Sequence, residues 1–189
     1  MLLPMLEVGY GNYIFTNQVL MICNPDSKPT RRIISKAKEN NTYIDLTFGK
    51  AGTCLIILNN GEVAMSAIDV NTIKKRYMRS INEINSSANS KANLEPFLEL
   101  GFKNYILPYN VTGIYKPGTN AMDRFIKNAR NQDLLIDCKQ GRSLRSVIKT
   151  TSDYVILSSK NPDTIIEKYM QYVKDVDTNT LVGEDKSGE

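Results

Sequence analysis

Residues 8–22 read VGYGNYIFTNQVLMI, and residues 100–114 read LGFKNYILPYNVTGI. The two stretches lie 92 positions apart, and the same offset aligns three further pairs of segments. These pairs are RRIISKAK with DRFIKNAR, YIDLTFGK with LIDCKQGR, and VNTIKKRYM with PDTIIEKYM. About 19 of roughly 70 aligned positions are identical without a gap, where chance gives about four. Because the offset is constant, the chain is interpreted as a tandem duplication of one small domain.

The duplication divides the chain into four parts. The first repeat spans residues 1–79 and the second spans residues 98–173, and each carries a net charge of +4. Residues 80–97 are rich in Asn and Ser, which predicts a flexible linker whose start can be helical. Residues 174–189 carry a net charge of −3 and are predicted to be an acidic disordered tail. Two equally basic bodies are compatible with an anionic partner without requiring one.

The composition of the 189 residues excludes several classes of function. The chain has no histidine, which removes Ser–His and Cys–His nucleophile pairs and most zinc sites. It also lacks the P-loop and the dinucleotide-binding fingerprint. We therefore expect no enzyme activity, no cofactor and no small-molecule substrate. The three cysteines lack CxxC spacing, which predicts buried reduced thiols and no metal site.

Two further features concern the location of the protein. No apolar run approaches the ~18 residues that a membrane span needs. The N-terminal residues lack the basic region and the cleavage site of a signal peptide. Both features favour a cytoplasmic protein that has no membrane contact.

The same order of elements is predicted in each repeat. In the first repeat, residues 6–15 and residues 19–23 are short β-branched and aromatic runs, which predict the two strands of a hairpin. Residues 31–38 then follow helical spacing with their apolar side chains on one face. Three strands within residues 42–68 and a closing helix from residues 69–78 complete a ββαβββα domain. The predicted fold class is α+β, and so small a domain gains stability by packing on neighbours.

The strongest basic signal is in the stretch IDCKQGRSLRSVI, residues 136–148. Gly141 predicts a positive φ in a turn between two strands, and Arg142 and Arg145 follow it. Guanidinium groups match phosphate with two parallel hydrogen bonds, so a phosphate contact is one interpretation. A solvated turn is the other. The corresponding turn of the first repeat retains only Lys50.

Other residues that both repeats share have a structural interpretation. Gly9 and Gly101 predict a turn, a bulge or a close backbone approach. Asp45 and Asp137 lie within apolar strands. We expect these carboxylates to bond a neighbouring loop, because no titratable residue is placed to make either of them catalytic.

Several of these motifs resemble the RemA family of small regulators of extracellular-matrix (biofilm) genes. The first repeat matches the family's pattern with GYGN at 9–12, NPDSKP at 24–29 and IDLTFG at 44–49. The second repeat matches it with GR at 141–142 and NPDTI at 161–165. Together the matches extend over most of the chain, so it is identified as a tandem member of this family.

The resemblance implies a DNA-binding protein whose domains close into a ring, with arginines around the ring that contact duplex DNA. In the family, one such arginine lies in the first hairpin, where this chain has Gln18 and Asn110. Others follow the glycine of the turn, where the chain has Lys50 in one repeat and Arg142 in the other. The candidate DNA-contacting residues are Arg142, Arg145, Lys50, Arg31, Arg32 and Arg124.

Two functions of different classes follow. The first is double-stranded DNA binding and transcriptional control by a homo-oligomeric ring, which fused repeats restrict to an even number of domains. The second is a structural or antagonist ring that co-assembles with a single-domain relative and binds DNA weakly or not at all. RNA binding is a third interpretation, and the absence of aromatic residues interleaved with basic ones weakens it.

Overall fold

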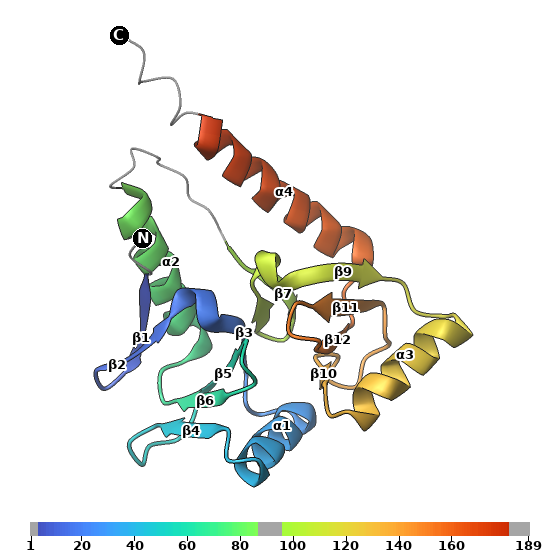
Figure 1. Ribbon diagram of the computed structural model, residues 1–189, viewed down its shortest axis with the longest axis horizontal. Coiled ribbons are helices and arrows are strands. Elements are labelled where there is room, and N and C mark those ends of the chain that lie inside the picture. Colours follow the sequence, from blue (N-terminus) through green and yellow to red (C-terminus); the bar gives the residue numbers. More distant parts are fainter. Residues whose placement is uncertain (1–3, 87–95, 182–189) are drawn as a thin grey trace.

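Both repeats are mixed α+β domains with the same order of elements, as predicted (Figure 1). The computed structural model describes residues 4–86 and 96–181. The first repeat consists of β1 (Met5–Gly9), β2 (Asn12–Phe15), β3 (Val19–Cys23), α1 (Lys28–Glu39), β4 (Tyr43–Leu46), β5 (Cys54–Leu58), β6 (Val63–Ser66) and α2 (Val70–Ser86). The second consists of β7 (Leu98–Gly101), β8 (Asn104–Ile106), β9 (Val111–Tyr115), α3 (Asn120–Asn131), β10 (Leu135–Asp137), β11 (Ser146–Thr150), β12 (Val155–Ser158) and α4 (Pro162–Leu181).

Each repeat has one strand more than the sequence predicted. The stretch 6–15 is not a single strand, because the chain reverses at Tyr10 and Gly11 to form the antiparallel hairpin β1–β2. Tyr10 and Gly11 have φ angles of 54° and 74°, so a left-handed turn was hidden within a continuous run of strand-forming residues. The expected hairpin loop, residues 16–18, is instead a short 3₁₀ turn that leads into β3. Gly9 has a φ of 115° at a bulge. A turn, a bulge or a close backbone approach was predicted there because both repeats have a glycine at this position.

One sheet contains strands of both repeats. Its order is β4-β6-β5-β3-β8-β7, so the second repeat's hairpin extends the first repeat's sheet. Strand β8 runs antiparallel to β3, with Met21 opposite Ile106 and Ile22 opposite Tyr105. The second repeat's own sheet has the order β10-β12-β11-β9, and β1–β2 forms a separate two-stranded sheet.

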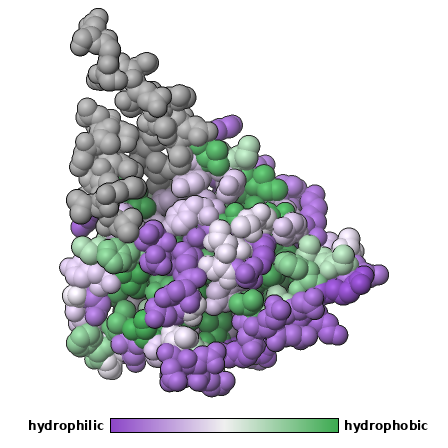
Figure 2. Space-filling view, in the orientation of Figure 1, coloured by the Kyte–Doolittle hydropathy of each residue, from purple (hydrophilic) through white to green (hydrophobic). Residues whose placement is uncertain are grey.

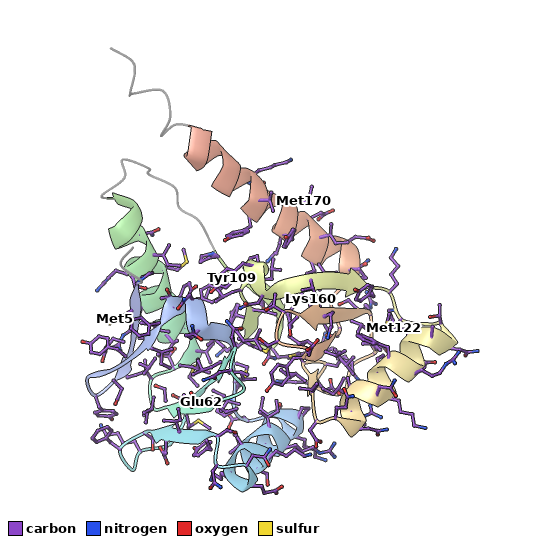
Figure 3. The ribbon with its side chains drawn as sticks, viewed as in Figure 1. Met5, Glu62, Tyr109, Met122, Lys160 and Met170 are labelled. Atoms are coloured by element: carbon purple, nitrogen blue, oxygen red, sulfur yellow. The ribbon has the colours of Figure 1, made fainter. Side chains whose placement is uncertain are left out.

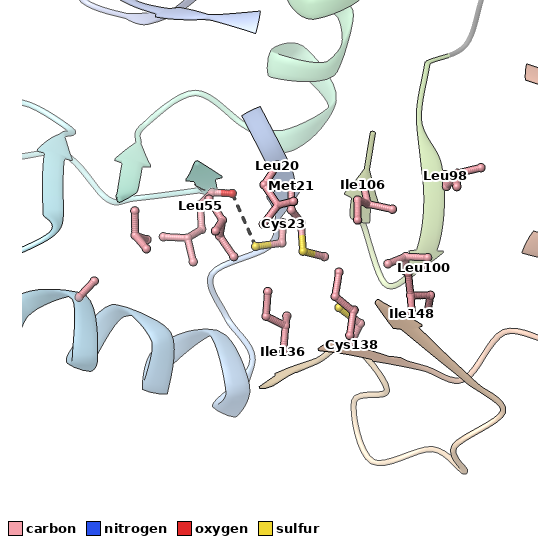
Figure 4. Packing of buried hydrophobic residues seen from close by; sticks show 14 of the residues in the cluster. Leu20, Met21, Cys23, Leu55, Leu98, Leu100, Ile106, Ile136, Cys138 and Ile148 are labelled. Atoms are coloured by element: carbon pink, nitrogen blue, oxygen red, sulfur yellow. Dashed lines mark hydrogen bonds between the residues drawn. The ribbon is translucent and has the colours of Figure 1, made fainter. Parts of the chain in front are cut away.

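The contact between the repeats is a continuous hydrophobic core (Figure 4). One cluster of buried side chains combines Met21 and Leu55 of the first repeat with Ile106 and Ile148 of the second. Fully buried apolar side chains of this size each contribute about 1.5–3 kcal/mol relative to exposure. The repeats are therefore joined as tightly as the layers of a single domain.

The three cysteines lie in the interior, as predicted. Cys23, Cys54 and Cys138 are all free and buried. The Sγ of Cys23 donates to the carbonyl oxygen of Leu55 at 3.6 Å. Burial raises the pKa of the Cys23 thiol to about 12, so this side chain stays neutral at physiological pH.

Hydrogen bonds fix the position of one repeat on the other. The hydroxyl of Tyr109 donates to the carbonyl oxygen of Thr16 at 3.1 Å and lies 3.1 Å from the hydroxyl of Tyr77. The Nδ2 of buried Asn110 donates to the carbonyl oxygen of Val19 at 2.9 Å. These polar groups give the apolar contact a defined register, because leaving the buried amide of Asn110 unpaired costs about 1–3 kcal/mol.

The helix ends correct part of the predicted organisation. Helix α2 continues to Ser86, into the start of the predicted linker 80–97, which was expected to be able to form a helix. Helix α4 continues to Leu181, so residues 174–181 are helical and do not belong to a disordered tail. A helix that has started extends at little cost until a breaker intervenes, and the first glycine here is Gly183. Residues 87–95 and 182–189 of the predicted linker and tail lie outside the described residues.

None of the described helices is long and apolar enough to cross a membrane.

Candidate nucleic-acid interface

The turn between β10 and β11 is held by its own backbone. The Oδ1 of Asp137 accepts from the backbone N–H of Lys139 at 2.9 Å, which is the loop-pinning role predicted for this carboxylate. The backbone N–H of Arg142 donates to the carbonyl oxygen of Lys139 at 3.1 Å. Gln140 and Gly141 have φ angles of 47° and 81°, so the glycine has the positive φ that was predicted. The turn therefore presents its basic residues from a fixed backbone.

Both arginines of this turn have exposed side chains. The guanidinium of Arg142 lies 5.1 Å from the centroid of the Phe102 ring, and this contact orients its planar donor face. The backbone N–H of Arg145 donates to the carbonyl oxygen of Ser158 at 2.9 Å, which anchors that end of the turn to β12. Within residues 4–86 and 96–181, neither guanidinium forms an ion pair, so both can bind an external anion.

A groove of about 490 Å³ runs between this turn and the N-terminal end of α1. The first repeat contributes Lys28 and Arg32, and the second contributes Gln140 and Gly141. The structure thus brings a predicted residue of one repeat, Arg32, beside the predicted turn of the other. Lys28 was not predicted, because its place in the groove depends on how the repeats pack and no local sequence signal marks it.

The groove is lined by equal numbers of basic and acidic side chains. Asp26 and Asp137 line it together with the basic side chains. The carboxylate of Asp137 lies 3.3 Å from the Nζ of Lys139, so its charge is balanced locally. In Figure 2, hydrophilic residues cover the lower and right edges of the visible face, where α1 and α3 lie.

The corresponding turn of the first repeat has a different surface. The Nζ of Lys50 lies 5.2 Å from the centroid of the Tyr10 ring, and the hydrogen bond with the Tyr10 side chain raises the pKa of this lysine. Tyr10 stacks on Phe48 with 4.7 Å between ring centroids, and Phe48 is 69% exposed. Asp45 accepts from the backbone N–H and the hydroxyl of Thr47, which lowers the pKa of this carboxyl. This turn therefore has one cation beside an exposed aromatic pair.

The remaining predicted residues lie on the first helix of each repeat. Arg31 is exposed on α1 but does not line the groove. Arg124 is exposed on α3, and its Nε donates to the carbonyl oxygen of Asn120 at 3.3 Å. Of the six predicted residues, only Arg32 lines the groove itself. Arg142 and Arg145 follow the lining residue Gly141 on the same turn, and Arg31, Arg124 and Lys50 lie elsewhere on the chain.

A larger cavity of about 670 Å³ lies between α1 and the end of α3. Its lining mixes basic and acidic side chains, and the ion pair between Lys36 and Asp133 joins the two repeats there. Within the described part of the chain, no three His, Cys, Asp or Glu side chains are grouped so that they could hold a metal ion.

Comparison with known proteins gives the same division of the chain. The model of the family described as "RemA-like: Extracellular matrix regulatory protein A-like" matches residues 5–77 and again residues 97–169. A protein of Cyanothece sp. named "Putative regulatory protein" is 34% identical over 86 residues, which are 46% of this chain and 94% of the relative. A relative of the same description in Finegoldia magna is 35% identical over 78 residues, which are 41% of this chain and 94% of the relative.

A third such relative, in Acaryochloris marina, is 36% identical over 76 residues, which are 40% of this chain and 86% of the relative. Each of these relatives is thus about as long as one repeat, and their names describe regulators rather than enzymes. The chain belongs to the RemA-like family and carries the domain of that family twice in tandem.

Proposed function

We propose that this protein is a cytoplasmic regulator of transcription that binds double-stranded DNA, with matrix genes among its targets. Its regulatory character follows from its family, and the DNA contact is the part that we add. The phosphate backbone is the ligand, and the bases are read only indirectly.

The groove between the repeats is the observation that carries this proposal. It sets Lys28 and Arg32 of one repeat beside the Gly141 turn of the other, and the exposed guanidinium of Arg142 directly follows this glycine. Guanidinium binds phosphate in a bidentate manner, and a glycine turn lets backbone N–H groups approach the same anion.

The chain assembles, in this proposal, into a homo-oligomeric ring with an even number of domains. Turns repeated around a ring contact several phosphates at a fixed spacing. Each neutralised phosphate adds to the salt dependence of binding, with a slope of about −0.9 per contact on a log–log plot. A fixed spacing also favours DNA of a suitable curvature, so selectivity arises from deformability.

Fluorescence anisotropy with a labelled duplex of random sequence, titrated at several salt concentrations, tests the DNA contact. We expect binding at low salt, a steep loss with added salt, and a large loss in the variant Arg142→Ala with Arg145→Ala. The control variant, Lys75→Ala with Arg79→Ala, removes the same charge from an exposed face of α2 and retains binding. Absence of binding at low salt, or equal effects of the two variants, contradicts the proposal. Tighter binding of a single-stranded RNA than of the duplex does the same.

A second candidate function is favoured by the weaker turn of the first repeat. With Lys50 in place of two arginines, the chain could join a ring of a single-domain relative and reduce the DNA affinity of that ring. Native mass spectrometry of this chain mixed with such a relative separates the two functions. Mixed rings that bind DNA less tightly than rings of the relative alone favour the antagonist.

A further inference from the structure

Each repeat contributes one surface to the contact between the repeats. The corresponding surface of the other repeat makes no such contact among the described residues. Strand β3 pairs with β5 on one side and with β8 on the other, whereas its counterpart β9 pairs only with β11 among the described strands. Similarly, β7–β8 extends a larger sheet, whereas β1–β2 forms a sheet of its own. One face of β1 packs on α2 through buried Leu6 and Val8, while an open strand edge accepts a further strand.

Exposure differs between corresponding positions of the two hairpins. Met5 is 54% exposed, whereas Phe97 at the same position of the second repeat is 5% exposed. Phe15 is 50% exposed, and its counterpart Leu107 is fully buried. In the second repeat, these positions are covered by the first repeat. In the first repeat, the large apolar side chains at the same positions are about half exposed.

The surface formed by β9 and α4, called the receiving surface below, shows the same difference in exposure. Tyr115 at the end of β9 is 40% exposed, where Cys23 at the end of β3 is fully buried. On helix α2, the Nζ of Lys74 lies 4.6 Å from the centroid of the Tyr105 ring. The counterpart of Lys74 on α4 is Ile166, an exposed apolar residue that suits the ring of Tyr13.

The two unused surfaces belong to different flanks of the molecule. Figure 3 shows Met5 on β1 at the left, Met170 on α4 at the upper right, and Tyr109 at the contact between the repeats. Since the hairpin and β9 of one chain lie apart, a second chain is the occupant that fits both surfaces. Repetition of one contact from chain to chain is head-to-tail, which is the geometry of rings and filaments.

We propose that the β1–β2 hairpin of one chain adds to strand β9 of a second chain in the register that β8 uses on β3. Tyr13 then lies opposite Ile114, and Ile14 lies opposite Gly113. This inference rests on the oligomer of the proposed function and names the surfaces that form it. It does not depend on whether the oligomer binds DNA.

The same contact builds a second groove. At the contact within the chain, the groove lies between the turn of the second repeat and the start of α1. At the contact between chains, the turn with Lys50 faces the start of α3. There Lys116 and Arg124 occupy the positions of Asn24 and Arg32, while the position of Lys28 is taken by Asn120. Lys116 lies 3.9 Å from Asp163 and both side chains are well exposed, so the lysine remains available to a phosphate. Lys50 thus acts together with two basic residues of the neighbouring chain.

Two variants, each with one damaged surface, test the proposal without DNA. Phe15→Asp places a charge on the hairpin, and Ile166→Glu places one on the receiving surface. The control is Lys75→Glu, because Lys75 stays exposed next to the contact that already exists and its counterpart is Glu167. We expect native mass spectrometry to show wild type and control as multiples of the 21.3 kDa chain. Each damaged variant remains a single chain, with its apparent dissociation constant raised at least about tenfold.

Mixing the two damaged variants distinguishes lost assembly from lost folding. One intact hairpin and one intact receiving surface remain in the mixture, so we expect a complex of two chains and none larger. A second measurement uses Tyr13→Cys with Ile166→Cys and a short thiol crosslinker, which gives a ladder of chain multiples on a denaturing gel, while either substitution alone gives no ladder. A wild-type chain that stays single at micromolar concentration overturns the proposal. So does a mixture in which the two variants do not pair.

Discussion

The two repeats differ most at the turn between their fourth and fifth strands. Both turns keep an aspartate that bonds the backbone and a glycine with φ near 80°, so the backbone requirements are the same. The exposed residues have diverged, from Arg142 and Arg145 in one repeat to Phe48 and Lys50 in the other. Residues that shape the turn are constrained by the fold, whereas residues that face solvent are constrained only by a partner. The difference therefore marks where the proposed DNA contacts of the two repeats differ.

The first hairpins of the two repeats also differ, in how deeply their side chains are buried. Ile106 of β8 is fully buried in the core that the repeats share, whereas Ile14 at the same position of β2 is only half-buried. We expect Ile106→Ala to lower the free energy of unfolding by about 2–5 kcal/mol, through lost transfer energy and the cavity left behind. Ile14→Ala costs less than about 1 kcal/mol in a single chain. Urea unfolding of both variants at low protein concentration measures the difference.

Equal costs for the two substitutions mean that the hairpins are equally buried, which contradicts the contact described here. A cost of Ile14→Ala that grows with protein concentration sharpens the comparison instead. Such growth shows that a second chain covers the first hairpin.

The second prediction concerns the turns. Arg142→Ala with Arg145→Ala is expected to weaken duplex DNA binding by about 10–100-fold and to reduce the salt slope by about two phosphate contacts. Lys50→Ala removes one contact and weakens binding by less than about tenfold. Anisotropy titrations of both variants in the same salt series compare the repeats directly. If Lys50→Ala is the more damaging change, the first repeat carries the main DNA contact and the assignment is reversed.

Much of the fold could be predicted from the sequence because each sequence pattern occurs twice, once in each repeat. The α+β class, the positive φ of Gly141 and the burial of the cysteines follow from residue types and spacing, and the structure confirms them. The hairpin at Tyr10 was missed because a tight left-handed turn interrupts strand-forming residues without changing their pattern. Pairing of β8 with β3 could not be predicted, since strand partners far apart in sequence are chosen by tertiary packing.

The candidate site was predictable only in part for the same reason. Arg142 and Arg145 stand out locally because they follow a glycine turn. Lys28 has no such signal, and it joins the groove only because the second repeat packs beside α1. A groove that forms between repeats requires the structure, even when one of its walls can be predicted from the sequence.

The third prediction uses the buried thiols, two of which lie in the first repeat and one in the second. Burial raises the pKa of Cys23 to about 12, while an unfolded cysteine ionises near ~8.5. The folded state is therefore fully stabilised below ~8.5, and stability falls as the pH rises towards 12, because only the unfolded chain releases the proton. We expect Cys23 to account for a loss of about 2 kcal/mol between pH 7 and pH 10.

Urea unfolding of wild type and Cys23→Ala at pH 7, 9 and 10 measures this loss. The variant is less stable at pH 7, because a small cavity remains, but it loses less stability on going to pH 10. Parallel pH dependence of the two proteins shows that Cys23 ionises in the folded state, which contradicts its burial. Cys138→Ala gives the matching measurement for the second repeat.

The smallest expected effect concerns an ion pair that is present in the contact within the chain but not in the proposed contact between chains. Within the chain, Lys36 and Asp133 form an ion pair across the repeats, and their side chains are 44% and 49% exposed. The corresponding residues at the other contact are Asn128 and Asn41, which cannot form one. A double-mutant cycle with Lys36→Asn and Asp133→Asn is expected to give only about 0.2–1 kcal/mol at low salt, because solvent screens exposed charges.

This coupling should decrease further as salt is added. A coupling above about 2 kcal/mol, or one that salt does not change, shows that the pair contributes much more to the contact than its exposure implies. A small coupling has a structural consequence, because the contact between chains then loses little by having asparagines at these positions. Strand addition and apolar burial are then sufficient for the contact within the chain and for the proposed contact between chains, and the ion pair only favours the partner that belongs to the same chain.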